Sequence, residues 1–145
     1  MRVKNIISIF VCALIMIMSV NVVSFADEFN SSDIIFMEDG QEEVIPFSVN
    51  ILNGRCNISF SNGKVNISAS VVGKSGVTKT SIITKLQELK SGRWVDLKTS
   101  SKKTGGKTCS VTNSYSVTKG HTYRGVAIIT AGNESKTLIS TSQKY

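Results

Sequence analysis

Short runs of alternating apolar and polar residues, separated by glycine-containing turns, fill the sequence after Pro46. Cys56–Phe60 alternates in this way, Asn62-Gly63 interrupts it, and the alternation resumes over Val65–Val71. A period of two is typical of a strand with one buried face. Asn-Gly suits a tight hairpin because both residues tolerate positive φ. The segment therefore predicts two antiparallel strands joined by a short turn.

The same pattern continues to the end of the chain. Further strands are expected around Ile82–Leu86, Arg93–Thr99, Cys109–Val117, Tyr123–Ala131 and Ser135–Ser142, each preceded or followed by a glycine-containing turn. About seven short strands with regularly spaced turns are typical of an antiparallel sandwich or barrel. The sequence therefore predicts an all-β fold, with Tyr123–Ala131, its most apolar strand, at the centre.

The segment Val117–Arg124 favours a sandwich over a barrel. It contains Gly120 and, three residues later, Tyr123. This arrangement resembles the corner that enters strand F of immunoglobulin-like and fibronectin type III sandwiches, where a tyrosine hydroxyl bonds back to the corner's backbone. The resemblance implies an antiparallel immunoglobulin-like sandwich with Gly120 and Tyr123 as its structural corner. Cys109 and Trp94 do not stand where antibody domains have their cysteine and tryptophan, so the resemblance is to the broad class.

A closer resemblance rests on three groups of residues. They are Ile58–Gly76, the Leu86-Gln87 and Gly92-Arg93-Trp94 hairpin, and Tyr115–Val117 with Gly120 and Tyr123-Arg124. They resemble a group of small secreted β-sandwich proteins of clostridial-type Gram-positive bacteria, a family without an established function. The similarity covers roughly the last two-thirds of the chain. Its motifs are turn and core motifs, so it implies a fold and a location, and no catalytic residues.

The first 26 residues have the layout of a secretory signal peptide. Arg2 and Lys4 precede an apolar run over Ile9–Met18, and Ser24-Phe25-Ala26 provides small residues for cleavage after Ala26. An uncleaved membrane anchor is the competing interpretation, but polar residues interrupt the stretch. No second stretch is long enough to span a bilayer. We therefore expect a secreted protein without a transmembrane segment after cleavage.

Charge divides the remaining chain into an acidic leader, residues 27–46, and a basic domain, residues 47–145. Seven acids and no base lie between Asp27 and Glu43, whereas fifteen bases and three acids follow Val44, a net charge of +12. We expect the leader to be flexible, with an apolar group, Ile34–Met37, that is able to dock on the domain. The basic excess favours an anionic partner such as a wall polymer, a glycan or a lipid surface, with no specific nucleic acid. Alternatively, the lysines keep the protein soluble and protect strand edges.

Two cysteines remain after the signal peptide is removed. Cys56 and Cys109 both alternate onto the inward side of their strands, and an oxidising compartment permits a bridge between them. Two distant cysteines do not make a metal site, which needs more donors at closer spacing. The sequence predicts a Cys56–Cys109 disulfide and no cofactor.

No group of residues has the pattern of a catalytic site. His121, the single histidine, lies at the predicted corner, and the three acids of the domain lie on separate elements. Trp94 is expected near the surface on the same side as Lys98, where the pair is a candidate ligand contact, although Trp94 also suits a cap on the core. We expect a non-enzymatic secreted protein that binds an anionic envelope or extracellular partner. The alternative is a secreted effector, bacteriocin-like or toxin-like, held in check by the acidic leader.

Overall fold

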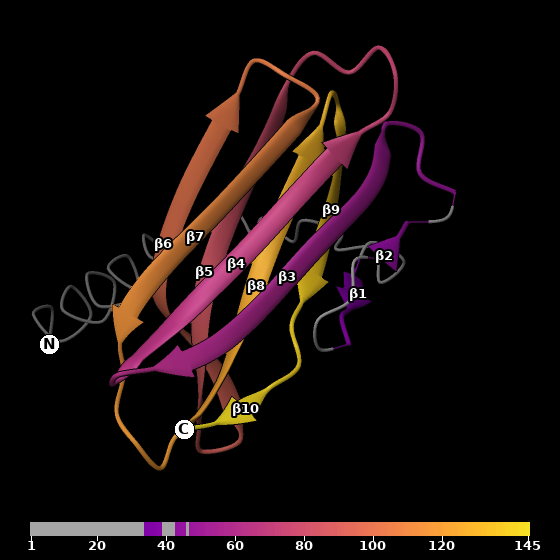
Figure 1. Ribbon diagram of the computed structural model, residues 1–145. Helices are drawn as coiled ribbons and strands as arrows, with labels where there is room; N and C mark the ends of the chain where they lie inside the picture. The colour runs from indigo at the N-terminus through magenta and orange to yellow at the C-terminus, as the bar shows by residue number, and fades with distance from the viewer. Residues whose placement is uncertain (1–33, 39–42, 46) are drawn as a thin grey trace, which may run out of the picture.

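The computed structural model describes residues 34–38, 43–45 and 47–145, and these residues form two facing β-sheets (Figure 1). The predicted signal peptide and residues 27–33, 39–42 and 46 of the predicted leader lie outside the described residues. Within the described part, no helix is long and apolar enough to cross a membrane. The strands are β1 (Ile34–Phe36), β2 (Glu43–Val44), β3 (Ile51–Ser61), β4 (Lys64–Gly73), β5 (Thr80–Lys90), β6 (Arg93–Thr104), β7 (Thr108–Ser116), β8 (Thr122–Ala131), β9 (Glu134–Ile139) and β10 (Gln143–Lys144).

Seven long strands, β3 to β9, make the sandwich. One sheet has the order β2-β3-β4-β7, and the other has the order β1-β9-β8-β5-β6 with β10 paired to β8. The long strands pair antiparallel throughout. The predicted all-β sandwich of about seven strands is therefore confirmed, and β8 lies inside its sheet between β5 and β9 as its apolar sequence indicates.

The core lies between the two sheets and follows the alternation of the strands. On β4, Val65, Ile67, Ala69 and Val71 are buried while the residues between them are partly exposed. Tyr123 and Leu86 belong to one core cluster. A larger cluster contains Cys56, Ile82, Ile129 and Leu138. Because a strand such as β4 buries one face and exposes the other, a one-residue slip would bring its polar side chains into the core, and this fixes its register.

Residues of the predicted leader are built into this sandwich. β1 pairs in parallel with β9, so that Phe36 lies opposite Ile139. Met37 and Ile45 are 3% and 4% exposed and both belong to the larger core cluster. The apolar group that the sequence offered for docking thus packs on the domain, and the boundary of the sandwich extends upstream of residue 47.

A carboxylate closes the end of the sandwich where β3 begins. The backbone amides of Asn50 and Ile51 donate to Glu134 Oε2 at 2.6 and 3.2 Å, and that of Val49 donates to Oε1 at 3.4 Å. Burial raises the pKa of Glu134, but these hydrogen bonds outweigh it and hold the pKa below its usual range. Successive amides that converge on an anion form a fixed positive site. Glu134 therefore ties the start of β9 to the start of β3.

Replacing Glu134 with glutamine is expected to lower the free energy of unfolding by about 1 kcal/mol at neutral pH, because a neutral amide makes weaker hydrogen bonds to the same amides. The folded pKa of Glu134 is below its unfolded pKa. Its contribution is therefore present above the unfolded pKa and is lost as the pH falls through the folded pKa. Urea unfolding of both proteins across this range should show two curves that converge in acid. A difference that stays constant with pH would contradict the assignment.

Candidate functional site

Tyr123 and Gly120 form a structural corner next to the core. The Tyr123 hydroxyl donates to the carbonyl of Thr118 at 3.0 Å and accepts from the Thr118 amide at 3.1 Å. Gly120 has a φ of +86°, a value that glycine adopts without a Cβ penalty. The tyrosine is only 2% exposed. These bonds satisfy backbone groups beside a buried ring, so Tyr123 supports the fold.

The disulfide expected between Cys56 and Cys109 does not form, since both thiols are free and buried. β4 lies between the two cysteines, with Ala69 opposite Cys56 and Val71 opposite Cys109. Two strand spacings, together with the offset of two residues between Ala69 and Val71, place the Cα atoms about 12 Å apart, beyond the limit of about 7 Å for a bridge. Burial raises the pKa of Cys56 to about 12, so its thiol stays protonated and behaves as a small apolar side chain.

Trp94 and Lys98 are separated by a bulge in β6. The register of β5 and β6 shifts between Leu86 and Gln87, so that Lys98 lies opposite Leu86 and Asp96 lies opposite Gln87. Opposed residues of paired strands share a face of the sheet. Leu86 is buried in the core, so Lys98 lies on the inner side of this edge strand, whereas Trp94 shares the outer face with Asp96. The expected pairing of Trp94 with Lys98 is therefore wrong.

Arg124 is the cation that lies beside Trp94, where the sequence predicted Lys98. Its Cζ atom lies 4.2 Å from the centroid of the Trp94 ring, within the range of a cation–π contact. Burial lowers the pKa of Arg124, while nearby Asp96 raises it. An arginine stays charged under such a shift. The sequence shows Arg124 next to the corner tyrosine, but only the strand order brings it to Trp94.

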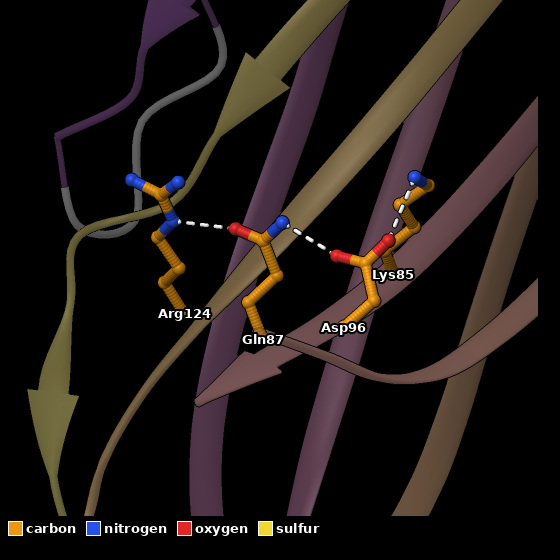
Figure 2. Close-up of polar contacts among 4 residues, drawn as sticks. All are labelled: Lys85, Gln87, Asp96 and Arg124. Atoms are coloured by element: carbon orange, nitrogen blue, oxygen red, sulfur yellow. Dashed lines mark hydrogen bonds and ion pairs between the residues drawn. The ribbon is translucent and has the colours of Figure 1, made fainter. Parts of the chain in front are cut away.

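Polar side chains continue from Arg124 across the outer face of this sheet (Figure 2). Arg124 Nε donates to Gln87 Oε1 at 2.7 Å, Gln87 Nε2 donates to Asp96 Oδ1 at 2.6 Å, and Lys85 Nζ lies 2.8 Å from Asp96 Oδ2. The Lys85 ammonium, and next the Gln87 amide, lower the pKa of Asp96. In the figure the terminal nitrogens of Arg124 point away from Gln87. The chain of bonds thus fixes the guanidinium and leaves its outer nitrogens available.

An open hollow adjoins Arg124 at this end of the face. It has a volume of about 360 Å³ and is lined by Phe36, Met37, Trp94, Arg124, Ile139 and residues 140–142. Phe36 is 71% exposed, an unusual state for a large aromatic side chain. β1 carries Phe36 to the hollow through its pairing with β9. The sequence analysis missed this residue, because only the docking of the upstream segment brings it there.

A second, smaller hollow lies at the opposite end of the same outer face. It has a volume of about 180 Å³ and is lined by Lys79, Thr80, Ser81, Lys103, Thr104, Thr130 and Gly132. The lining contains two exposed lysines and no acid. Lys107 lies in the adjoining turn, where the Gly106 carbonyl accepts a hydrogen bond from the Thr80 hydroxyl. Ammonium groups beside hydroxyl groups are suited to phosphate or carboxylate oxygens.

The three acids after Val44 are all engaged elsewhere. Glu88 lies 3.0 Å from the Lys90 ammonium and also contacts His121, and the bond to Lys90 is the main cause that lowers its pKa. Asp96 is bound by Lys85, and Glu134 by backbone amides. Among the described residues, no group of three or more His, Cys, Asp or Glu side chains is placed to hold a metal ion. None of these three carboxylates lines the hollow that contains Lys79 and Lys103, which we call the lysine hollow.

Comparison of the chain with known protein families, with curated proteins and with solved structures finds no match. The resemblance to secreted proteins of clostridial-type bacteria therefore stays a prediction. What the site can do follows from its side chains. The outer face of the β9-β8-β5-β6 sheet has cationic side chains at both ends, an exposed aromatic ring at the end with Arg124, and hydroxyl groups at the end with the lysines.

Proposed function

We propose that the protein is a secreted, non-enzymatic binding module for an anionic polymer at the cell envelope. The observation that carries this proposal is the unbalanced charge of the domain. The net charge after Val44 is +12, and each of the three acids in this part is already engaged. Such a field attracts polyanions over long range and is screened by salt.

The lysine hollow is the part of the domain best suited to make the contact. Lys79 and Lys103 line it, Lys107 adjoins it, and all three side chains are exposed. The hydroxyl group of Ser81, which also lines the hollow, can donate to the same oxygens. The predicted signal peptide restricts the polymer to those outside the membrane, such as phosphate-bearing wall polymers and acidic glycans.

The test compares two triple variants with the same net charge. K79Q/K103Q/K107Q removes the lysines at the hollow, and K64Q/R93Q/K144Q removes three exposed bases elsewhere. Binding to purified cell wall that carries phosphate polymers is expected to fall about tenfold or more in the first variant, if each contact contributes up to about 1 kcal/mol. The second variant should lose much less, because it keeps the hollow.

Salt dependence provides the second measurement. Binding of the unmodified protein should fall steeply between about 0.1 M and about 1 M salt, where the Debye length shortens from about 10 Å to about 3 Å. Wall stripped of its phosphate polymers serves as the control surface. If the protein does not bind cell wall at low salt, the proposed function is wrong. If the two variants lose equal affinity, the proposed location of the contact at the lysine hollow is wrong.

A further inference from the structure

We propose that the hollow between Phe36 and Arg124 is a separate binding site for a small organic monocarboxylate with an apolar body. It goes beyond polymer binding because it lies at the other end of the outer face. Thr130 lines the lysine hollow and Arg124 lines this one, both on β8. They are six positions apart on the strand, a distance of about 20 Å.

The carboxylate of the ligand is inferred from the contacts that Arg124 makes and from those that it leaves open. Its Nε atom is bound to Gln87 and its guanidinium is stacked on Trp94. Within the described part of the chain, the two terminal nitrogens make no hydrogen bond. A guanidinium that is oriented in advance and keeps two parallel donors free matches a carboxylate in a two-point contact. Arg124 is the single ionisable side chain of the lining, which favours a monoanion over a doubly charged phosphate.

The apolar body of the ligand is inferred from the apolar side chains that line the hollow. Phe36 is 71% exposed and lies beside Ile139, while Met37 is buried below. A ligand that covers the Phe36 ring would remove apolar surface from water without disturbing the core. Small-molecule sites commonly combine such an apolar wall with one charged group that fixes orientation. The volume of about 360 Å³ is within the range of ligand pockets.

The chain contains one tryptophan, and it lines the hollow, so its fluorescence reports directly on occupancy. The probe is 3-phenylpropanoate, and 3-phenylpropanamide, which has the same shape and no charge, is its control. We expect the acid to change Trp94 emission with a dissociation constant on the order of 1 mM, a value consistent with a ligand of this size. The amide should bind at least several-fold more weakly.

Two pairs of variants locate the site. R124Q should weaken acid binding about tenfold, whereas R93Q, which alters an exposed arginine outside the hollow, should leave it unchanged. F36A should weaken it several-fold, whereas F47A removes a fully exposed phenylalanine outside the lining and should have no effect. Amide chemical shifts of Thr141 and Ser142 give a second readout that does not depend on the tryptophan. Equal binding of acid and amide, or equal effects within either pair, would overturn the proposal.

Discussion

Replacing both Met37 and Ile45 with alanine is expected to lower the free energy of unfolding by about 4 kcal/mol or more. Each side chain is almost fully buried in the larger core cluster, and truncation of such a residue costs about 2–5 kcal/mol. The loss is a large part of the stability of an ordinary domain. Equilibrium unfolding in urea measures it through the midpoint. F47A is the control, because it removes a large apolar side chain that is fully exposed. Equal midpoints for the double variant and F47A would show that the upstream segment does not stabilise the fold.

This prediction also bears on the alternative function. A leader that only restrains an effector should be removable, leaving a folded and more active domain. Met37 and Ile45 instead contribute to the same core as Ile129 and Leu138. We therefore expect that deletion of residues 27–46 damages the fold before it releases any activity. Activity against neighbouring cells that rises after this deletion, with the fold intact, would favour the effector.

The sandwich could be predicted from sequence because the signals are local. Strand alternation on β4, the positive-φ turn at Asn62-Gly63 and the tyrosine at the start of β8 each act within a few residues. The contribution of Ile34–Phe36 to the sheet could not be predicted. Three residues in an acidic segment carry almost no periodicity, and their parallel pairing with β9 joins positions about one hundred residues apart in the chain.

The candidate site was predictable only at Trp94. Alternation assigned Lys98 to the same face, but the bulge opposite Leu86 adds one residue to β6 and reverses the side on which Lys98 lies. A bulge of this kind has no marker in the sequence Asp96-Leu97-Lys98. The predicted disulfide between Cys56 and Cys109 is wrong for a related reason. Both residues point inward as alternation predicts, but alternation gives no strand order, and β4 separates them.

Replacing Gly125 with valine is expected to destabilise the sandwich by about 1–3 kcal/mol or more, the usual cost of overpacking a core. A Cβ atom at this position would lie 2.9 Å from Ile58 Cγ2 and 3.4 Å from Cys56 Sγ and Ile67 Cγ2. The residues in contact belong to the facing sheet, and a branched Cγ2 close to the backbone cannot swing away. β8 therefore has glycine and Ala127 on its inner face, where the contacts with the facing sheet leave little room for a larger side chain.

G105V is the matched control for this substitution, because a Cβ atom at Gly105 meets nothing within 4 Å. Urea unfolding of both variants should show a clear loss of stability for G125V and little change for G105V. The comparison removes the general effect of replacing glycine, since both variants lose the same freedom in the unfolded chain. An equal change in both would mean that the sheets are not packed as closely at Gly125 as the distances indicate. Because valine favours strands, any intrinsic preference acts against the expected loss, so an observed destabilisation must come from the contact with Ile58 and its neighbours.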